Sequence, residues 1–490
     1  MPLVTPPAAV PASPLVARPL RVGFVTLGCD KNTVDTERYL GQLAGRGAVP
    51  AEDLGEAEVI VVNTCGFIDA AKRESIDAIV EAARYKQDGQ CRAVVALGCL
   101  VQRHKGELEQ ALPEVDLFLG SSEVDRLLPE LDARGLLGAP VELHPGERVF
   151  AGELPHVRYL KVSEGCDHGC AFCAIPLMRG RHRSFAADDV VREAQLLEMQ
   201  GARELNLVAQ DLAHYGRDLR GGDVRLPELL ERLVAETGVP WLRLMYLYSA
   251  GITPRLLEVV AREPRILPYL DIPIQHASDA VLARMRRPER QRTIRDRVTR
   301  FRDAVPGLAI RTTCIVGFPG ETDADFDELL AFLEEIEFDR VGAFTYSPQE
   351  GTRAHAMPDD VPDWLKRERL ERLTELQRAV TAERYERHVG SVVPALVNRA
   401  PPVAGGALEA RLYLQADDID GVTRVTGAPD ALAAATPGSI VDVRVRDVVD
   451  DYDFEATLVR LVDAPAAAAP ARRTRQLPMA AASSAGSFGR

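Results

Sequence analysis

Short apolar runs that alternate with longer amphipathic stretches constrain the fold of this chain more than any other feature. Between residues 20 and 140, the apolar runs 21–28, 58–64 and 92–98 alternate with helical stretches such as 69–85. A strand–helix–strand alternation predicts a parallel sheet with right-handed crossovers. Strands that are apolar throughout fit a sheet covered on both faces. We therefore expect an open parallel α/β domain over residues 20–140.

The same alternation continues through a second unit, expected over residues 150–380. Its six predicted strands are 157–163, 204–209, 241–248, 269–274, 308–316 and 340–346. Six strand–helix units are fewer than a closed eight-stranded barrel needs, so they predict a partial (βα)6 barrel. The chemistry of such a barrel belongs at the carboxyl ends of its strands.

The rest of the chain is predicted to form a small β-barrel between two disordered tails. Residues 386–463 contain short β-type runs separated by turn signals, which is typical of a small β domain. Residues 1–19 and 464–490 are low in complexity and rich in Pro and Ala, and we expect both to be disordered. Prolines interrupt the first segment and no run of eighteen apolar residues occurs, so we expect a cytoplasmic protein without a transmembrane helix.

Composition narrows the class of protein further. Of 490 residues, 46% are hydrophobic, and 59 basic against 73 acidic side chains give a net charge of −14. This net negative charge argues against a protein that binds nucleic acid over its whole surface. Eight cysteines are also too few for a disulfide scaffold in so long a chain.

Three cysteines come directly after predicted strands of the first unit. They are Cys29, Cys65 and Cys99. Because the carboxyl ends of parallel strands meet at one edge of a sheet, we expect the three thiols to lie together. A metal or iron–sulfur site explains this placement better than three unrelated small buried residues. The adjacent glycines, which allow close backbone packing, are Gly28, Gly66 and Gly98. Cys91 begins its strand and should lie at the opposite edge.

A second group of cysteines follows the first strand of the second unit. Cys166, Cys170 and Cys173 are separated by three and two residues. A structural zinc site normally has four ligands in paired CxxC form, so the triplet fits a 4Fe–4S cluster with one open iron better. We interpret His168 as a solvent-facing or supporting residue rather than a ligand. Cys314, inside a predicted strand, is expected to be an inert core thiol.

The triplet, with Phe172 before its last cysteine, resembles that of the radical S-adenosylmethionine (SAM) superfamily. The resemblance implies that the three thiolates hold a cluster whose open iron binds the methionine part of SAM. It also implies that an electron from the cluster cleaves SAM to a 5′-deoxyadenosyl radical, which abstracts a hydrogen from the substrate. In such enzymes the protein positions the reactants and keeps the site dry.

Other segments at predicted strand ends fit the barrel mouth of such an enzyme. They are 209–211 (AQD), 271–278 (DIPIQHAS) and 316–322 (VGFPGET). The polar residues that we interpret as SAM or substrate contacts are Asp211, Gln275 and Glu321. Each of them fits the alternative of a capping or turn residue equally well.

The order of the three units indicates a smaller family than the cysteine triplet alone. A three-cysteine α/β domain, a radical SAM barrel and a small TRAM-like β domain resemble the methylthiotransferases over residues 20–463. The resemblance implies a second 4Fe–4S cluster, on Cys29, Cys65 and Cys99. It further implies that SAM is both methyl donor and radical source, and that a sulfur source and an electron donor such as flavodoxin or ferredoxin take part.

Two branches of this family differ in substrate. One modifies isopentenyl-adenosine in tRNA (MiaB-like), and the other modifies the β-carbon of an aspartate in ribosomal protein S-twelve. The segments that resemble the protein-modifying branch are 27–37, 63–75, 175–180 and 344–352. Residues 389–463 carry six arginines and no lysines against ten aspartates and two glutamates, a net charge of −6. An acidic domain suits a basic protein better than tRNA, whose phosphates need Lys and Arg. A non-catalytic, metal-stabilised protein that docks on the ribosome is the alternative from another class.

Overall fold

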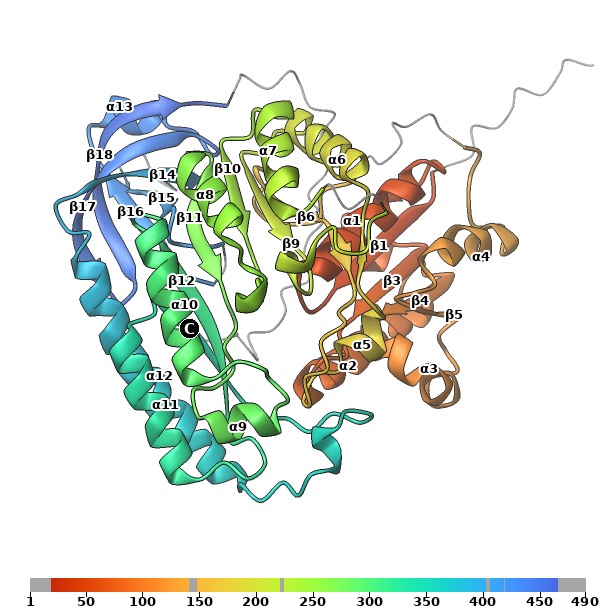
Figure 1. Cartoon of the computed structure of the whole chain (residues 1–490). Helices are drawn as coiled ribbons and strands as arrows, with labels where there is room; N and C mark the ends of the chain where they lie inside the picture. Colours follow the sequence, from red (N-terminus) through yellow and green to blue (C-terminus); the bar gives the residue numbers. More distant parts are fainter. Residues whose placement is uncertain (1–18, 141–147, 221–223, 402–405, 418, 466–490) are drawn as a thin grey trace, which may run out of the picture.

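The computed structural model describes residues 19–140, 148–220, 224–401, 406–417 and 419–465. Almost all of both predicted disordered tails, residues 1–18 and 466–490, lies outside these ranges. The described chain forms three main sheets in sequence order, shown from red through green to blue in Figure 1, and a small two-stranded sheet of β7 (Ser163–Glu164) and β8 (Arg183–Ser184). The predicted α/β class and the three kinds of sheet are confirmed.

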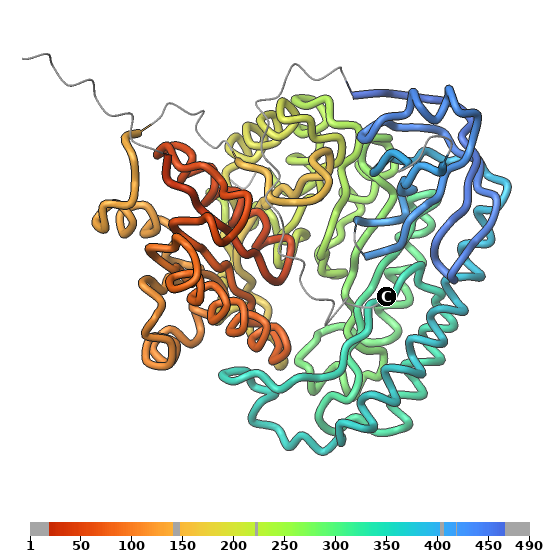
Figure 2. Tube along the Cα trace, turned by 180° about the vertical axis from the view of Figure 1, so that it is seen from behind, coloured from red at the N-terminus to blue at the C-terminus, as the bar shows by residue number. Residues whose placement is uncertain are grey.

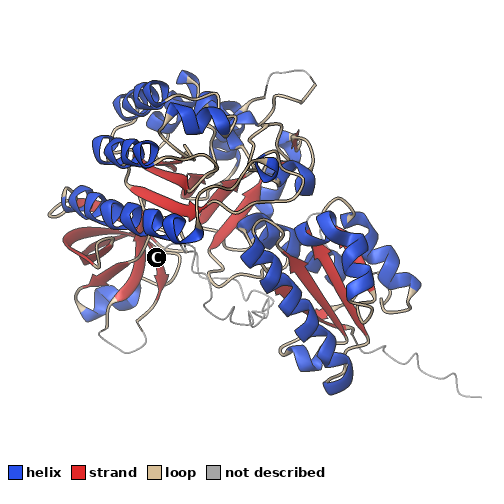
Figure 3. Cartoon of the chain, turned by 90° about the horizontal axis from the view of Figure 1, so that it is seen from below, coloured by secondary structure: helices blue, strands red, loops and turns tan. Residues whose placement is uncertain are grey.

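The first sheet is parallel throughout, in the order β2-β1-β3-β4-β5. Its strands are β1 (Arg21–Thr26), β2 (Val49–Pro50), β3 (Val59–Thr64), β4 (Ala93–Gly98) and β5 (Leu117–Gly120). Its helices are α1 (Asp30–Ala44), α2 (Asp69–Asp88), α3 (Cys99–Ala111) and α4 (Leu127–Ala133). Alternate residues of β3 enter two separate cores, Val59 and Val61 on one face and Ile60 and Val62 on the other. Figure 3 shows helices on both faces of this sheet, as the apolar strands predicted.

The second sheet is an open, parallel, six-stranded partial barrel in the order β13-β12-β11-β10-β9-β6. Its strands are β6 (Val157–Lys161), β9 (Glu204–Val208), β10 (Trp241–Leu244), β11 (Ile266–Asp271), β12 (Ala309–Val316) and β13 (Arg340–Thr345). The main covering helices are α6 (Ala187–Met199), α7 (Leu226–Glu236), α8 (Pro254–Arg262), α10 (Gln291–Ala304), α11 (Asp323–Ile336) and α12 (Asp363–Glu386). β10 ends earlier than the pattern predicts, because Tyr246 turns into the left-handed region with φ of 61°.

The third sheet is a closed barrel in the order β14-β15-β16-β18-β17. Its strands are β14 (Val392–Arg399), β15 (Leu408–Leu412), β16 (Thr423–Thr426), β17 (Ile440–Val449) and β18 (Asp453–Asp463), with α13 (Pro429–Ala434) before β17. This barrel packs against the amino-terminal ends of the central strands, where Trp241 and Tyr269 share one apolar core with Leu396 and Val441. Figure 2 shows the contact from behind.

A buried ion cluster crosses this contact. Glu204 of β9 accepts hydrogen bonds from Arg243 of β10 at 2.7 Å and from Arg411 of β15 at 2.6 Å. Burial alone would raise the pKa of Glu204, but the two guanidiniums, Arg411 and then Arg243, lower it to about 2. The carboxylate therefore stays charged at neutral pH and joins the central barrel to the small one.

We expect Glu204→Gln to lower the free energy of unfolding by about 3–5 kcal/mol, because it leaves buried Arg243 without its anion and leaves Arg411 with the more distant carboxylate of Asp417 at 3.4 Å. Urea unfolding followed by circular dichroism measures this loss. The contribution is present in full above the pKa of an unfolded glutamate and disappears as pH falls towards 2. The control is Glu236→Gln, which removes an exposed ion pair with Arg232 and should cost less than about 1 kcal/mol.

Candidate functional site

The first set of cysteines lies at the carboxyl edge of the N-terminal sheet, as predicted. Cys29 caps the start of α1, Cys65 directly follows β3, and Cys99 begins α3 directly after β4. Cys65 and Cys99 are buried, whereas Cys29 is exposed. Cys91, which precedes β4, bonds the carbonyl of Ala93 through its thiol and lies at the other end of that strand.

Glycines bring the three cysteines close together. A Cβ on Gly28, whose φ is +91°, would lie 3.0 Å from Cys65 Sγ. A Cβ on Gly66 would lie 2.8 Å from the Cα of Leu100 and 3.1 Å from the carbonyl carbon of Cys99. The backbones that carry the thiols therefore meet at distances that only glycine allows.

The buried side-chain amide of Asn32 connects two strand ends at this edge through hydrogen bonds. It donates to the carbonyl of Leu27 at 2.7 Å and to that of Thr64 at 3.1 Å. The Asn63 side chain in turn donates to the carbonyl of Asn32 at 2.9 Å. The loops that carry Cys29 and Cys65 are thus held in place by hydrogen bonds, not by apolar packing alone.

The second set lies in the loop between β7 (Ser163–Glu164) and α5 (Ile175–Arg179). Cys166 is buried, and Cys170 and Cys173 are half-buried. The loop folds back on itself: the amide of Cys166 donates to the carbonyl of Gly180 at 3.1 Å, and that of Cys173 to the carbonyl of Cys170 at 3.3 Å. The three thiols therefore line one short loop at the carboxyl end of the first barrel strand.

Burial makes most of these thiols difficult to ionise. It raises the pKa of Cys65 and Cys173 to about 12, and that of Cys99 and Cys166 to about 11. Such thiols remain protonated at neutral pH unless a cation replaces the proton. Their chemistry fits ligands of a metal cluster, whose binding releases the protons, and does not fit free nucleophiles.

Asp211 supports the loop of the second set. Its carboxylate accepts from His168 Nε2 at 2.7 Å and also contacts His214, while the amides of Ala213 and Tyr248 donate to its other oxygen at 3.0 and 3.2 Å. The His168 ring stacks on Tyr248 with centroids 4.0 Å apart. Burial would raise the pKa of Asp211, but the two histidines hold it well below its usual range.

Glu321 and Gln275 hold backbone at neighbouring strand ends. Glu321 is buried, accepts from the amides of Gly317 at 2.8 Å and Phe318 at 3.2 Å, and pairs with Arg369 at 2.9 Å. Gln275 has a φ of 72°, its amide and carbonyl pair with the backbone of β12, and its side chain is half-buried. Cys314 lies beside Gln275 in β12 and is fully buried.

The two sets of cysteines meet at the junction of the first and second units. Cys99 shares a small apolar core with Met178 and with Ala174, the neighbour of Cys173, and α3 packs against α5 (Figure 1). The residue that crosses the junction is Arg179, whose Nε donates to Cys99 Sγ at 3.2 Å. Arg179 was not among the site residues predicted from the sequence, although the segment 175–180 contains it.

Buried ion pairs also cross the junction between the first and second units. The Arg179 guanidinium also donates to Asp35 of α1 at 2.6 Å and to the side-chain oxygen of Asn32. Lys161 of β6 contacts Asp35 and pairs with Glu164 at 2.6 Å. We call Asp35, Lys161, Glu164 and Arg179 the junction cluster. It holds the two thiol edges against each other.

Comparison with known proteins places the chain in a family. Three families match it: an uncharacterized protein family, UPF0004, over residues 21–120, the radical SAM superfamily over 160–333, and the TRAM domain over 389–459. The ribosomal protein uS12 methylthiotransferase RimO of Anaeromyxobacter sp. (strain K) is 46% identical over 465 residues, which cover 94% of this chain and 96% of that protein. The RimO proteins of Desulforudis audaxviator and Geobacter sulfurreducens are 46% and 41% identical, covering 91% and 90% of this chain and 99% and 98% of those proteins.

The chain belongs to the RimO family. It is therefore a radical SAM methylthiotransferase whose cofactors are SAM and two 4Fe–4S clusters, and not a non-catalytic docking protein. Among solved structures, the radical SAM methyltransferase TsrM of Kitasatospora setae is similar in fold, with a TM-score of 0.51 and 13% identity over 66% of this chain and 72% of that one. At this identity the likeness concerns the fold alone.

We expect Gly66→Ala to lower the iron bound by the first set, because the added Cβ would meet the backbone of Leu100 at 2.8 Å and push apart Cys65 and Cys99. The measurement is iron per chain in a variant whose Cys166, Cys170 and Cys173 are alanine. About four irons are expected without the glycine change and less than half of that with it.

The matched control is Gly106→Ala in α3 of the same unit. A Cβ on Gly106 meets nothing within 4 Å, so this variant should keep its iron. Equal iron in both glycine variants would contradict the close-packing role of Gly66.

Proposed function

We propose that this chain inserts a methylthio group at the β-carbon of an aspartate of uS12, the small-subunit ribosomal protein S-twelve, with SAM as methyl donor and radical source. The observation that carries the proposal is the meeting of two three-cysteine sets at one junction, in a chain that RimO proteins match over nearly its full length. A reaction that needs both a radical and a sulfur–methyl unit requires both sites next to one substrate.

In this proposal, Cys166, Cys170 and Cys173 hold the cluster that binds SAM, and the first set holds the other. Three thiols in each set leave one iron open in a cubane cluster, which suits a site that must also bind SAM or sulfur. When bound, the clusters supply the electron and the sulfur chemistry. Gln275 remains a proposed SAM or substrate contact, whereas Asp211 and Glu321 are proposed to act by positioning the loops that they hold.

Two arginines are placed to support the thiols. Arg287 Nη1 lies 3.8 Å from Cys170 Sγ, and its guanidinium stacks over the ring of Tyr248 at 4.3 Å. Arg179 donates to Cys99 from the opposite unit. Hydrogen bonds and positive charge next to cluster ligands favour their thiolate form and tune the cluster. Each set therefore has one buried guanidinium against one of its thiols.

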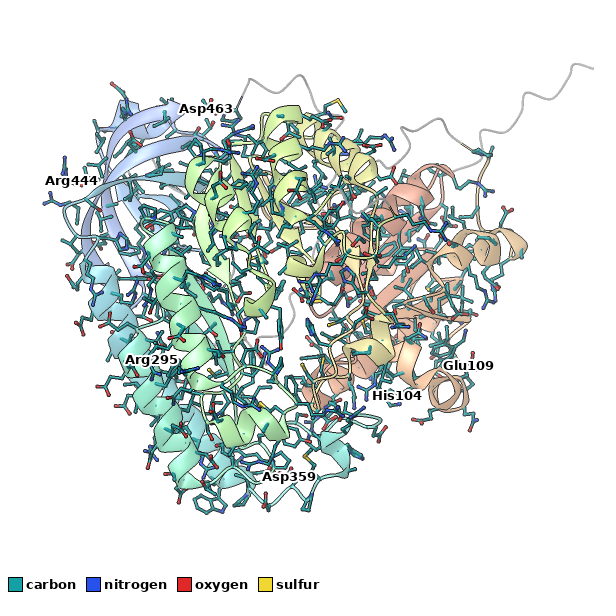
Figure 4. The ribbon with its side chains drawn as sticks, viewed as in Figure 1. His104, Glu109, Arg295, Asp359, Arg444 and Asp463 are labelled. Atoms are coloured by element: carbon teal, nitrogen blue, oxygen red, sulfur yellow. The ribbon has the colours of Figure 1, made fainter. Side chains whose placement is uncertain are left out.

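The charge of the small barrel supports a protein substrate over the tRNA alternative. Its net charge is −6 over residues 389–463, and several of its arginines are already paired. Arg399 pairs with Glu409, Arg411 with Glu204, and Arg460 with Asp442. Arg444 and Asp463, labelled in Figure 4, project from the outer side of this barrel. A domain in which acidic side chains outnumber arginines two to one disfavours phosphates and suits a basic protein.

The remaining partners follow from the reaction. An electron donor such as flavodoxin or ferredoxin and a source of sulfur are needed for turnover, and a ribosomal substrate implies a cytoplasmic enzyme. None of the helices in the described part of the chain has the length and apolar character to cross a membrane.

We expect the two sets of cysteines to fail in different ways. Alanine at Cys166, Cys170 or Cys173 should abolish cleavage of SAM to 5′-deoxyadenosine. Alanine at Cys29, Cys65 or Cys99 should abolish the methylthio product while uncoupled SAM cleavage continues. Chromatography of the nucleoside products and mass spectrometry of uS12 measure both. Full product formation without the first set would contradict its role. Cys314→Ala, in the core of β12, is the control that should retain both activities.

The substrate is tested by turnover under anaerobic conditions. We expect reconstituted enzyme, given SAM and a reductant, to add the mass of one methylthio group to uS12. Isopentenyl-adenosine in tRNA should gain none, because the acidic small barrel repels phosphate. Modification of the tRNA and not of uS12 would overturn the proposed function.

A further inference from the structure

Lys31 projects from the N-terminal unit onto the end of β10. It lies two residues after Cys29 in the first turn of α1. Its ammonium nitrogen is 3.0 Å from the centroid of the Tyr246 ring, and the hydroxyl of Tyr246 is 3.5 Å from Asp30 Oδ1. This places a lysine next to the first set of cysteines and over the carboxyl edge of the barrel, where the substrate must enter.

The surface beneath Lys31 is strained. Tyr246 holds a φ of 61°, a left-handed conformation that a bulky side chain disfavours. Neighbouring hydrogen bonds impose it: the Tyr246 carbonyl accepts from the Leu212 amide at 2.9 Å, and the Leu247 amide donates to the backbone carbonyl of Asp271 at 2.8 Å. Backbone strain of this kind persists where it serves a site. Here it sets the Tyr246 ring under the ammonium as a cation–π platform.

The ammonium of Lys31 has fewer acceptors around it than the other buried cations of the region. Arg179 engages Cys99, Asp35 and Asn32, and Lys161 contacts two carboxylates. The side chain of Lys31 is 9% exposed, and its one ion pair with a described residue is to Asp30 Oδ1 at 3.2 Å. A nearly buried ammonium with free N–H groups is costly unless a further acceptor completes its shell.

We propose that Lys31 binds the side-chain carboxylate of the substrate aspartate. This inference rests on the proposed function, in which the reacting β-carbon is bonded directly to the carboxyl carbon. An anchor for that carboxylate must therefore lie at the reacting site, and Lys31 lies two residues after Cys29 with its ammonium over the end of β10. The anchored carboxylate fixes which β-hydrogen faces the radical source. Adenine in tRNA presents no anion at its reacting carbon, so the same lysine favours a protein substrate.

The test is a double-mutant cycle between enzyme and substrate. Binding of uS12, and of uS12 with its target Asp changed to Asn, is measured on reconstituted enzyme with SAM but without reductant, so that no turnover occurs. Wild-type enzyme should bind the Asn form about ten-fold or more weakly, since one charge-assisted pair is lost. Lys31→Met should bind both forms alike, and Lys31→Arg should retain a preference for Asp.

The matched control is Lys105→Met, which removes a partly exposed lysine of the same unit that pairs with Glu123; its preference for Asp should equal that of wild type. An undiminished preference in Lys31→Met would overturn the proposal. So would equal binding of the Asp and Asn forms by wild-type enzyme, a result that does not depend on how well the variant folds. Methylthiolation of uS12 by wild-type enzyme, followed separately, tells a failure of this inference from a failure of the proposed function.

Discussion

The junction cluster is the interaction on which the rest of the site depends. Asp35 and Arg179 belong to different units, and their ion pair at 2.6 Å is buried beside Cys99. Burial would raise the pKa of Asp35, but Lys161 and Arg179 hold it well below its usual range, so the carboxylate remains charged at neutral pH. Buried ion pairs add little net stability compared with apolar packing. A buried ion pair is satisfied in one geometry only, which suits a contact that must hold two sets of thiols in a fixed relative position.

Buried ion pairs also join the other units of the chain. Glu37 of α1 accepts from Arg148 and Arg158 in the segment that enters the barrel. Glu204 joins β10 to the small barrel through two further arginines. The planar guanidinium groups of these arginines thus fix how the units pack, next to the apolar core that the central strands share with the small barrel. Because these contacts and the apolar cores determine the fold, the loops at the strand ends can carry cysteines and charged residues that serve the site.

The sequence predicted those parts of the site that depend on local pattern. Cys29, Cys65 and Cys99 follow apolar strands, and parallel strands bring such positions to one edge whatever the details of packing. The spacing of the second set likewise confines three thiols to one loop. Asp211 was selected for the same reason, but its carboxylate is engaged by two histidines and two amides.

Contacts between units could not be predicted from the same patterns. Arg179 reaches a thiol 80 positions away, and Lys31 lies on an aromatic ring more than two hundred positions away. Both residues stand inside segments that the sequence singled out, 175–180 and 27–37, yet a lone charged side chain in a loop or first helical turn usually faces water. The packing of the two units shows that these charges are buried: α5 against α3 buries Arg179, and the start of α1 against Tyr246 buries Lys31.

Iron stoichiometry is the most direct test of the central claim that each set of three cysteines holds its own 4Fe–4S cluster. Iron and sulfide analysis with Mössbauer spectroscopy, on anaerobically reconstituted protein, measures it. We predict about eight irons per chain for the wild type, and about four for each triple variant in which one set is alanine. About four irons in the wild type, with all of them lost from one triple variant and none from the other, would contradict the account.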